Sequence, residues 1–102
     1  MPKIKKNTCA VVGGLGFLGE NIANELLLLN YEVKIIDKIK LNKKNYFQCD
    51  IKDYNKLKNL LSDCEFVFNF AGIADISEAN EDPLKTINEN IIGSSNIFDI
   101  CS

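Results

Sequence analysis

Short apolar runs and amphipathic stretches alternate along this chain. Residues 8–12 form a continuous apolar run, and residues 20–30 carry apolar side chains at helical spacing over a wide face, with Asn30 as the C-terminal cap. An apolar run without alternation is typical of a strand that is buried on both faces of a parallel sheet. Further strands are predicted over residues 32–37, 46–49 and 66–70, and further helices over residues 53–62, capped by Asp53, and over residues 83–101. The predicted order of elements is therefore β-α-β-β-α-β-α.

This order predicts the α/β fold class, with a Rossmann-like, doubly wound parallel sheet. Double winding places the strands in the order 3-2-1-4, with all of them buried. Residues 1–102 are expected to be the first part of one nucleotide-binding domain that ends before a fifth strand, because such a sheet needs about six strands. The edge beside the fourth strand would then be open unless another segment covers it.

Composition narrows the classes of function. The net charge is −2, so there is no basic surface to attract a nucleic acid. The chain has no histidine, which excludes histidine-based nucleophiles and the usual histidine metal ligands, and no metal site is predicted. The first apolar run is too short to cross a membrane. Four cysteines without a CxxC pair favour free thiols in the cytoplasm.

The most informative segment is the glycine-rich stretch from Gly13 to Gly19. It contains both GxGxxG and GxxGxxG, sharing Gly16 and Gly19. Glycines allow a strand to turn sharply into a helix while its backbone approaches a pyrophosphate, which the helix N-terminus then binds. A plain glycine-rich turn is the alternative. The preceding strand, the following helix and an acid at the end of the next strand, Asp37, together favour dinucleotide binding. A Walker A loop is excluded because no Gly-Lys-Ser/Thr follows.

Asp37 also indicates which dinucleotide is bound. Its carboxylate can accept both hydroxyl hydrogens of an adenosine ribose and repels a 2′-phosphate. Lys38 and Lys40 are close in sequence and would soften that repulsion. NAD is therefore favoured over NADP.

The loop from Gly13 to Gly19 resembles the GGxGFIG signature of the extended short-chain dehydrogenase/reductases. This is the NAD-dependent epimerase/dehydratase group, which includes UDP-glucose 4-epimerase and sugar-nucleotide dehydratases. Val12 stands where the family often has threonine, and Asn69 stands where it usually has histidine. Asparagine offers both a donor and an acceptor, so neither departure affects the expected fold.

Three further segments agree with this resemblance. Asp50-Ile51 is similar to the Asp-Ile pair that contacts adenine, and residues 69–72 resemble the H-x-A-A/G element beside the adenosine and nicotinamide. Residues 82–96 resemble the dP…NV.GT.N helix, in which the asparagine at the position of Asn90 supports the cofactor site. The cofactor-binding residues expected from the loop, the acid and the resemblance are Gly13, Gly16, Phe17, Leu18, Gly19, Asp37, Asp50, Ile51, Phe70, Ala71, Gly72 and Asn90.

The resemblance implies the NAD-binding portion of a nucleotide-sugar epimerase or dehydratase. Family catalysis uses a Tyr-xxx-Lys pair that follows the fifth strand. The string Tyr54 to Lys58 fits this spacing but lies on the helix after the third strand, so we interpret it as a solvated helix face. No catalytic residue is predicted, and the chain alone is expected to be inactive. The alternatives are a stand-alone dinucleotide-binding or sensor module and an NADP-linked reductase of the same superfamily.

The resemblance also bears on partners. A nucleotide-sugar substrate is implied for the full-length enzyme. The last helix, residues 83–101, corresponds to one that commonly forms dimer interfaces in the family. Its isoleucines fit either a homodimer interface or ordinary packing on the sheet.

Overall fold

A computed structural model describes residues 4–70, 92, 93 and 95–102. The strands are β1 (Lys5–Val12), β2 (Glu32–Asp37), β3 (Tyr46–Gln48) and β4 (Cys64–Asn69), and the helices are α1 (Phe17–Leu28) and α2 (Tyr54–Leu61). Residues 92, 93 and 95–101 are also helical, and we call them the C-terminal helix. The rest of the helix predicted from residue 83 lies outside the described residues.

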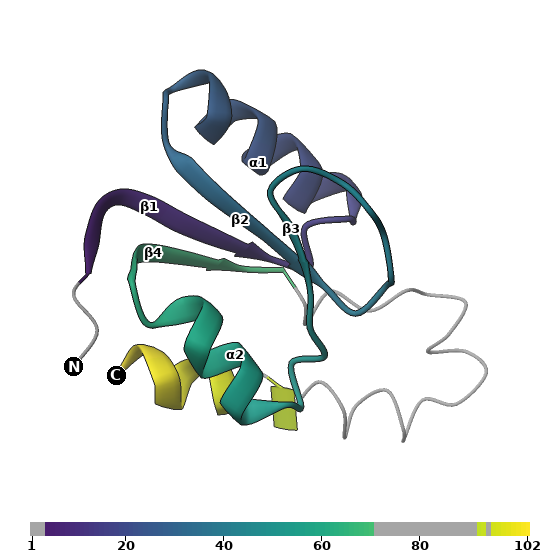
Figure 1. Ribbon diagram of the computed structural model, residues 1–102, viewed down its shortest axis with the longest axis vertical. Coiled ribbons are helices and arrows are strands. Elements are labelled where there is room, and N and C mark those ends of the chain that lie inside the picture. Colours follow the sequence, from purple (N-terminus) through teal and green to yellow (C-terminus); the bar gives the residue numbers. More distant parts are fainter. Residues whose placement is uncertain (1–3, 71–91, 94) are drawn as a thin grey trace.

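The four strands form one parallel sheet in the order β3-β2-β1-β4, which confirms the predicted topology. Helix α1 lies on one face of the sheet, and α2 and the C-terminal helix lie on the other (Figure 1). Because all strands run in the same direction, their carboxyl ends meet at one edge. Ligands of doubly wound sheets bind outside that edge.

Strand β1 lies at the centre of the sheet and explains the unbroken apolar run. Cys9 and Val11 pack in the cluster with Ala23 of α1, whereas Ala10 and Val12 pack in the cluster with Leu57 of α2. All four strand residues are 0–1% exposed. Successive side chains of a strand point to opposite faces, so a strand covered on both faces needs apolar residues at every position.

The prediction that every strand is buried is wrong at the two edges of the sheet. Phe66 in β4 is 48% exposed, and Phe47 in β3 is 40% exposed. Within the described part of the chain each of these strands pairs with one neighbour and lies at an edge of the sheet, where side chains have less cover. The predicted bounds of β2 are confirmed, whereas those of the other strands differ by one to three residues. The largest difference is at Lys5, because β1 begins before the predicted run with an irregular register up to Cys9.

Helix α1 begins and ends differently from the prediction. It starts at Phe17, three residues before the predicted residue 20, because the loop closes at Gly16. Asn30, the predicted C-terminal cap, adopts a left-handed φ of 66°, and its N–H donates to Leu27 O while that of Tyr31 donates to Leu26 O. These two bonds complete a Schellman motif. The apolar face is narrower than predicted, since Leu27, Leu28 and Leu29 are exposed.

Helix α2 follows the prediction closely. The side chain of Asp53 accepts a hydrogen bond from the backbone N–H of Lys56 and so caps the helix. Leu57 and Leu61 are buried, and Leu60 packs against the same core. No helix in the described part of the chain is long and apolar enough to cross a membrane.

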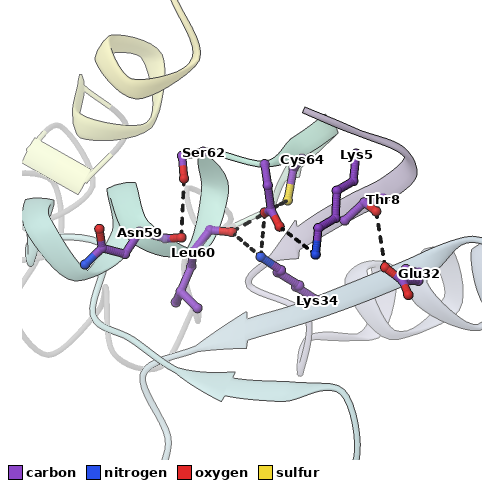
Figure 2. A network of polar contacts seen from close by, with 9 residues as sticks. Lys5, Thr8, Glu32, Lys34, Asn59, Leu60, Ser62 and Cys64 are labelled. Carbon is purple, nitrogen blue, oxygen red and sulfur yellow. Dashed lines mark hydrogen bonds and ion pairs between the residues drawn. The ribbon is translucent and has the colours of Figure 1, made fainter. Parts of the chain in front are cut away.

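A polar network that the sequence reading did not predict joins β1, β2 and the end of α2 (Figure 2). Lys34 Nζ lies 2.6 Å from Asp63 Oδ1 and 2.8 Å from Leu60 O. Lys5 Nζ approaches the other oxygen of Asp63 at 3.8 Å. The lysine in the middle of β2 thereby ties the strand to the C-terminal turn of α2.

Candidate functional site

The loop between β1 and α1 is anchored to the neighbouring strand. Gly13 has a φ of 78°, in the left-handed region that glycine adopts at little cost. The N–H groups of Gly13 and Gly14 both donate to Ile36 O, at 2.8 and 3.3 Å. The loop therefore turns directly over the carboxyl end of β2.

The glycines of the loop serve different purposes. A Cβ on Gly14 would lie 2.5 Å from Ile35 Cγ2, and one on Gly19 would lie 2.6 Å from Gly13 O. The fold itself therefore leaves no room for a side chain at Gly14 or Gly19. A Cβ on Gly16 would meet only Gly13 O, at an ordinary contact distance of 3.5 Å, and Gly16 has an extended backbone with φ −73° and ψ 164°. Nothing in the described chain requires glycine at this position.

The start of α1 offers free hydrogen-bond donors beside Gly16. The N–H of Gly16 donates to Gly13 O and that of Glu20 to Gly16 O, whereas those of Phe17, Leu18 and Gly19 find no acceptor among the described residues. No side chain of the described residues caps this end of the helix. Unpaired N–H groups and the helix dipole favour an anion at this point.

Asp37, at the end of β2, lies against the glycine loop. Its Oδ2 accepts the N–H of Leu15 at 3.3 Å, and its Oδ1 accepts the N–H of Lys38 at 2.8 Å. A carboxylate has about four acceptor sites, so these two bonds leave capacity for two further donors. The loop and the acid, far apart in sequence, therefore form one continuous polar surface.

Asp50 and Ile51 follow β3 and lie beside Asp37. The N–H of Cys49 donates to Asp37 O at 2.8 Å, which fixes the end of β3 next to the end of β2. Asp50 is exposed, and its Oδ1 accepts the N–H of Lys52 at 3.0 Å, with Lys52 Nζ 4.0 Å from Oδ2. Ile51 is half-buried and packs on the core.

The remaining predicted site residues are divided between described and undescribed parts of the chain. Phe17 and Leu18 are exposed at the start of α1. Phe70 continues β4, since its N–H donates to Val12 O at 2.8 Å, and its half-buried ring packs against the core on the α1 side. Ala71, Gly72 and Asn90 lie outside the described residues. The described part of the site thus includes the ends of all four strands.

Tyr54 differs from the solvated residue that we expected. It is half-buried, and its O–H donates to the carboxylate of Asp99 in the C-terminal helix. This hydrogen bond raises the pKa of the Tyr54 phenol above its ordinary value, with smaller contributions from burial and from the charge of Asp99. A tyrosine that exchanges protons near neutrality needs a lowered pKa. Tyr54 therefore joins two helices, and its environment opposes proton transfer.

Sequence reasoning missed the contacts that position the ends of β2 and β3. The O–H of Tyr46 donates to Ile39 O, and Gln48 Nε2 donates to Lys38 O at 3.3 Å. These two side chains of β3 therefore hold the segment after Asp37 in place. Asn96 Nδ2 donates to Ile51 O at 2.9 Å across 45 residues of sequence. The one signal in the sequence was Tyr46, because a tyrosine in a predicted buried strand needs a hydrogen-bond partner for its O–H.

Comparison with known proteins places the chain in a family. Residues 9–102 match the model of the NAD dependent epimerase/dehydratase family. Because the match includes nearly the whole chain, the chain belongs to the NAD-dependent epimerase/dehydratase family, as its glycine loop indicated.

The similar proteins are longer than this chain. A UDP-N-acetyl-alpha-D-glucosaminuronate decarboxylase from Bacillus cytotoxicus is 28% identical over 91% of this chain and 32% of its own length. A UDP-glucose 4-epimerase from Mycoplasma genitalium is 28% identical over 95% of this chain and 32% of its own length. The structure of UDP-glucose 4-epimerase from Brucella ovis in complex with NAD has a TM-score of 0.78 and 28% identity, with 93% of this chain and 32% of that one covered. The chain spans about a third of the length of these relatives.

Proposed function

We propose that this chain is the NAD-binding portion of a nucleotide-sugar epimerase or dehydratase. The observation that carries the proposal is the open space at Gly16, beside three unpaired N–H groups at the start of α1. An L-residue could adopt the backbone of Gly16, and none of the described residues fills the space beside it, which supports a bound ligand at this place. A pyrophosphate fits, because it is anionic and would lie where a Cβ would project.

The other residues of the site follow in order across the sheet. Asp37, next to the loop, is proposed to accept the ribose hydroxyls, and Asp50 and Ile51 at the end of β3 are proposed to contact the adenine. Phe70, on the other side of β1, extends the site towards the nicotinamide, together with Ala71, Gly72 and Asn90 by their resemblance to the family. This order supports residues 1–102 as the first part of a Rossmann domain.

In the family-type reaction, bound NAD would accept a hydride from a sugar carbon. The residues described above bind and orient the dinucleotide and supply no proton-transfer group. The substrate class is proposed from relatives that act on UDP-sugars. Buried free thiols at Cys9, Cys49 and Cys64 support a reducing compartment, and the cytoplasm is the proposed location.

A homodimer through the last helix is also proposed. Within the C-terminal helix Ile97 is buried in the core, whereas Ile92 and Phe98 are 51% and 73% exposed. Large apolar side chains on the outer face of a helix support an interface with a second copy.

The choice of NAD over NADP can be tested at Asp37. Asp37→Ala is expected to weaken NAD binding about tenfold, which corresponds to the loss of one charge-assisted hydrogen bond to the ribose. NADP binding should weaken less or improve, since the repulsion of the 2′-phosphate is removed as well. Titration calorimetry with both dinucleotides measures the two dissociation constants. An equal loss for NAD and NADP would contradict the role of Asp37, and the absence of NAD binding to the unmodified chain would contradict the proposed function.

A further inference from the structure

The C-terminal helix holds the turn after β3 at two points. Asn96 Nδ2 donates to Ile51 O at 2.9 Å. A Cβ on Gly93 would lie 1.9 Å from Ile51 Cδ1 and 2.2 Å from Ile51 Cγ1, so the side chain of Ile51 occupies the space that glycine leaves. One residue of the turn is thus fixed by its backbone carbonyl and by its side chain, both against the same helix.

That turn carries the acid at the far end of the proposed dinucleotide site. Asp50 directly precedes Ile51, and the preceding Cys49 is bonded through its N–H to Asp37 O. The glycine loop, Asp37 and Asp50 follow the ends of β1, β2 and β3, which are neighbours in the sheet. A dinucleotide with its pyrophosphate at the loop and its ribose at Asp37 places its base beyond β2, next to Asp50.

Asp50 is suited to recognise adenine only if it is held in place. An ionised carboxylate accepts hydrogen bonds and donates none, and the exocyclic amine of adenine is a donor. The Asp50 side chain is exposed, and its own contacts are the local ones to Lys52. The position of its backbone depends on Cys49, which is bonded to β2, on its own carbonyl, which accepts the N–H of Asp53 at 2.9 Å, and on Ile51, which is fixed by the C-terminal helix.

We propose that Asn96 is a positioning residue for the adenine end of the dinucleotide site, acting through Ile51 on Asp50. The inference rests on the proposed function and deepens it. The helix itself has other attachments, since Ile97 is buried in the core, Ile100 packs against it and Asp99 accepts the O–H of Tyr54. The helix therefore stays attached without the amide of Asn96. Loss of that amide is expected to affect the turn after β3 instead.

The test compares NAD with nicotinamide hypoxanthine dinucleotide, in which a carbonyl replaces the adenine amine. Asn96→Ala is expected to weaken NAD binding about tenfold, the equivalent of one net hydrogen bond. It should weaken binding of the hypoxanthine analogue much less, so the ratio of the two dissociation constants, which measures the preference for adenine, should become smaller. Calorimetry also gives the binding-competent fraction of the protein, which should stay unchanged.

Two further variants separate positioning from folding. Tyr54→Phe removes a polar contact between α2 and the C-terminal helix that does not involve Ile51, and it is expected to leave both dissociation constants unchanged. Gly93→Ala favours the helix intrinsically but displaces the side chain of Ile51, so it should narrow the adenine preference as Asn96→Ala does.

Each outcome decides between the two proposals. Loss of adenine preference in Asn96→Ala and Gly93→Ala but not in Tyr54→Phe supports the positioning role. Equal weakening of both ligands, or the same change in Tyr54→Phe, overturns it in favour of a structural role. Unchanged binding in the Asn96 and Gly93 variants overturns it while the proposed function stands. Failure of the unmodified chain to bind NAD overturns both.

Discussion

Gly16→Ala is expected to leave the chain folded and to reduce its affinity for NAD about a hundredfold, which corresponds to the loss of one to two charge-assisted hydrogen bonds. The added Cβ meets, among the described residues, Gly13 O at 3.5 Å, and the backbone of Gly16 is extended, so the free energy of unfolding should fall by less than about 1 kcal/mol, the cost of alanine at a helix N-cap. The same methyl group projects into the space proposed for the pyrophosphate. Calorimetric titration with NAD and urea unfolding measure the two quantities on one protein.

Gly19→Ala is the matched control for this prediction. Its Cβ would lie 2.6 Å from Gly13 O and 2.9 Å from Gly14 Cα, both backbone atoms of the loop. The loop must shift to admit it, at a cost of about 1–3 kcal/mol in the free energy of unfolding. If Gly16→Ala lost stability to the same extent, or bound NAD normally, Gly16 would be an ordinary turn glycine and the proposed pyrophosphate site would be wrong.

The features that the sequence predicted correctly depend on residues close together in the chain. The apolar run of β1, the cap at Asp53 and the left-handed Asn30 each follow from local patterns. The strand order β3-β2-β1-β4 follows from those elements because double winding leaves few arrangements. The meeting of Asp37 with the glycine loop follows from that order, since both lie at the carboxyl ends of adjacent strands.

The features that the sequence could not predict depend on pairs of distant side chains. Ile51 was predicted as a site residue because it resembles an adenine contact of the family. Asn96 was not predicted, because a hydrogen bond across 45 residues leaves no local pattern in the sequence. The glycine loop is an example within a predicted motif. Gly14, Gly16 and Gly19 belong to one GxGxxG pattern, yet a side chain fits only at Gly16, and the positions of Ile35 and Gly13 cause this difference.

Asp63→Asn is expected to lower the free energy of unfolding by about 1–3 kcal/mol at pH 7, because Lys34 loses its charged partner. The two side chains are 21% and 20% exposed, so the full cost of breaking a buried pair does not apply. The hydrogen bond from Lys34 Nζ, at 2.6 Å, holds the pKa of the Asp63 carboxyl below its ordinary value, although partial burial opposes this. This effect follows from the polar network in Figure 2 and does not depend on a bound ligand.

The lowered pKa fixes the pH range of the effect. A carboxylate whose pKa is lower in the folded chain contributes stability that is fully present above its unfolded pKa, about 4, and that is lost as the pH falls through the folded value. Urea unfolding from pH 7 to pH 3 should therefore show a steeper loss for the unmodified chain, with the two curves converging in acid. Lys5→Ala is the control, because Lys5 is 66% exposed and 3.8 Å from Asp63, and it should change stability by less than about 0.5 kcal/mol. Parallel curves for Asp63→Asn and the unmodified chain would show that the charge of Asp63 does not stabilise the fold through Lys34.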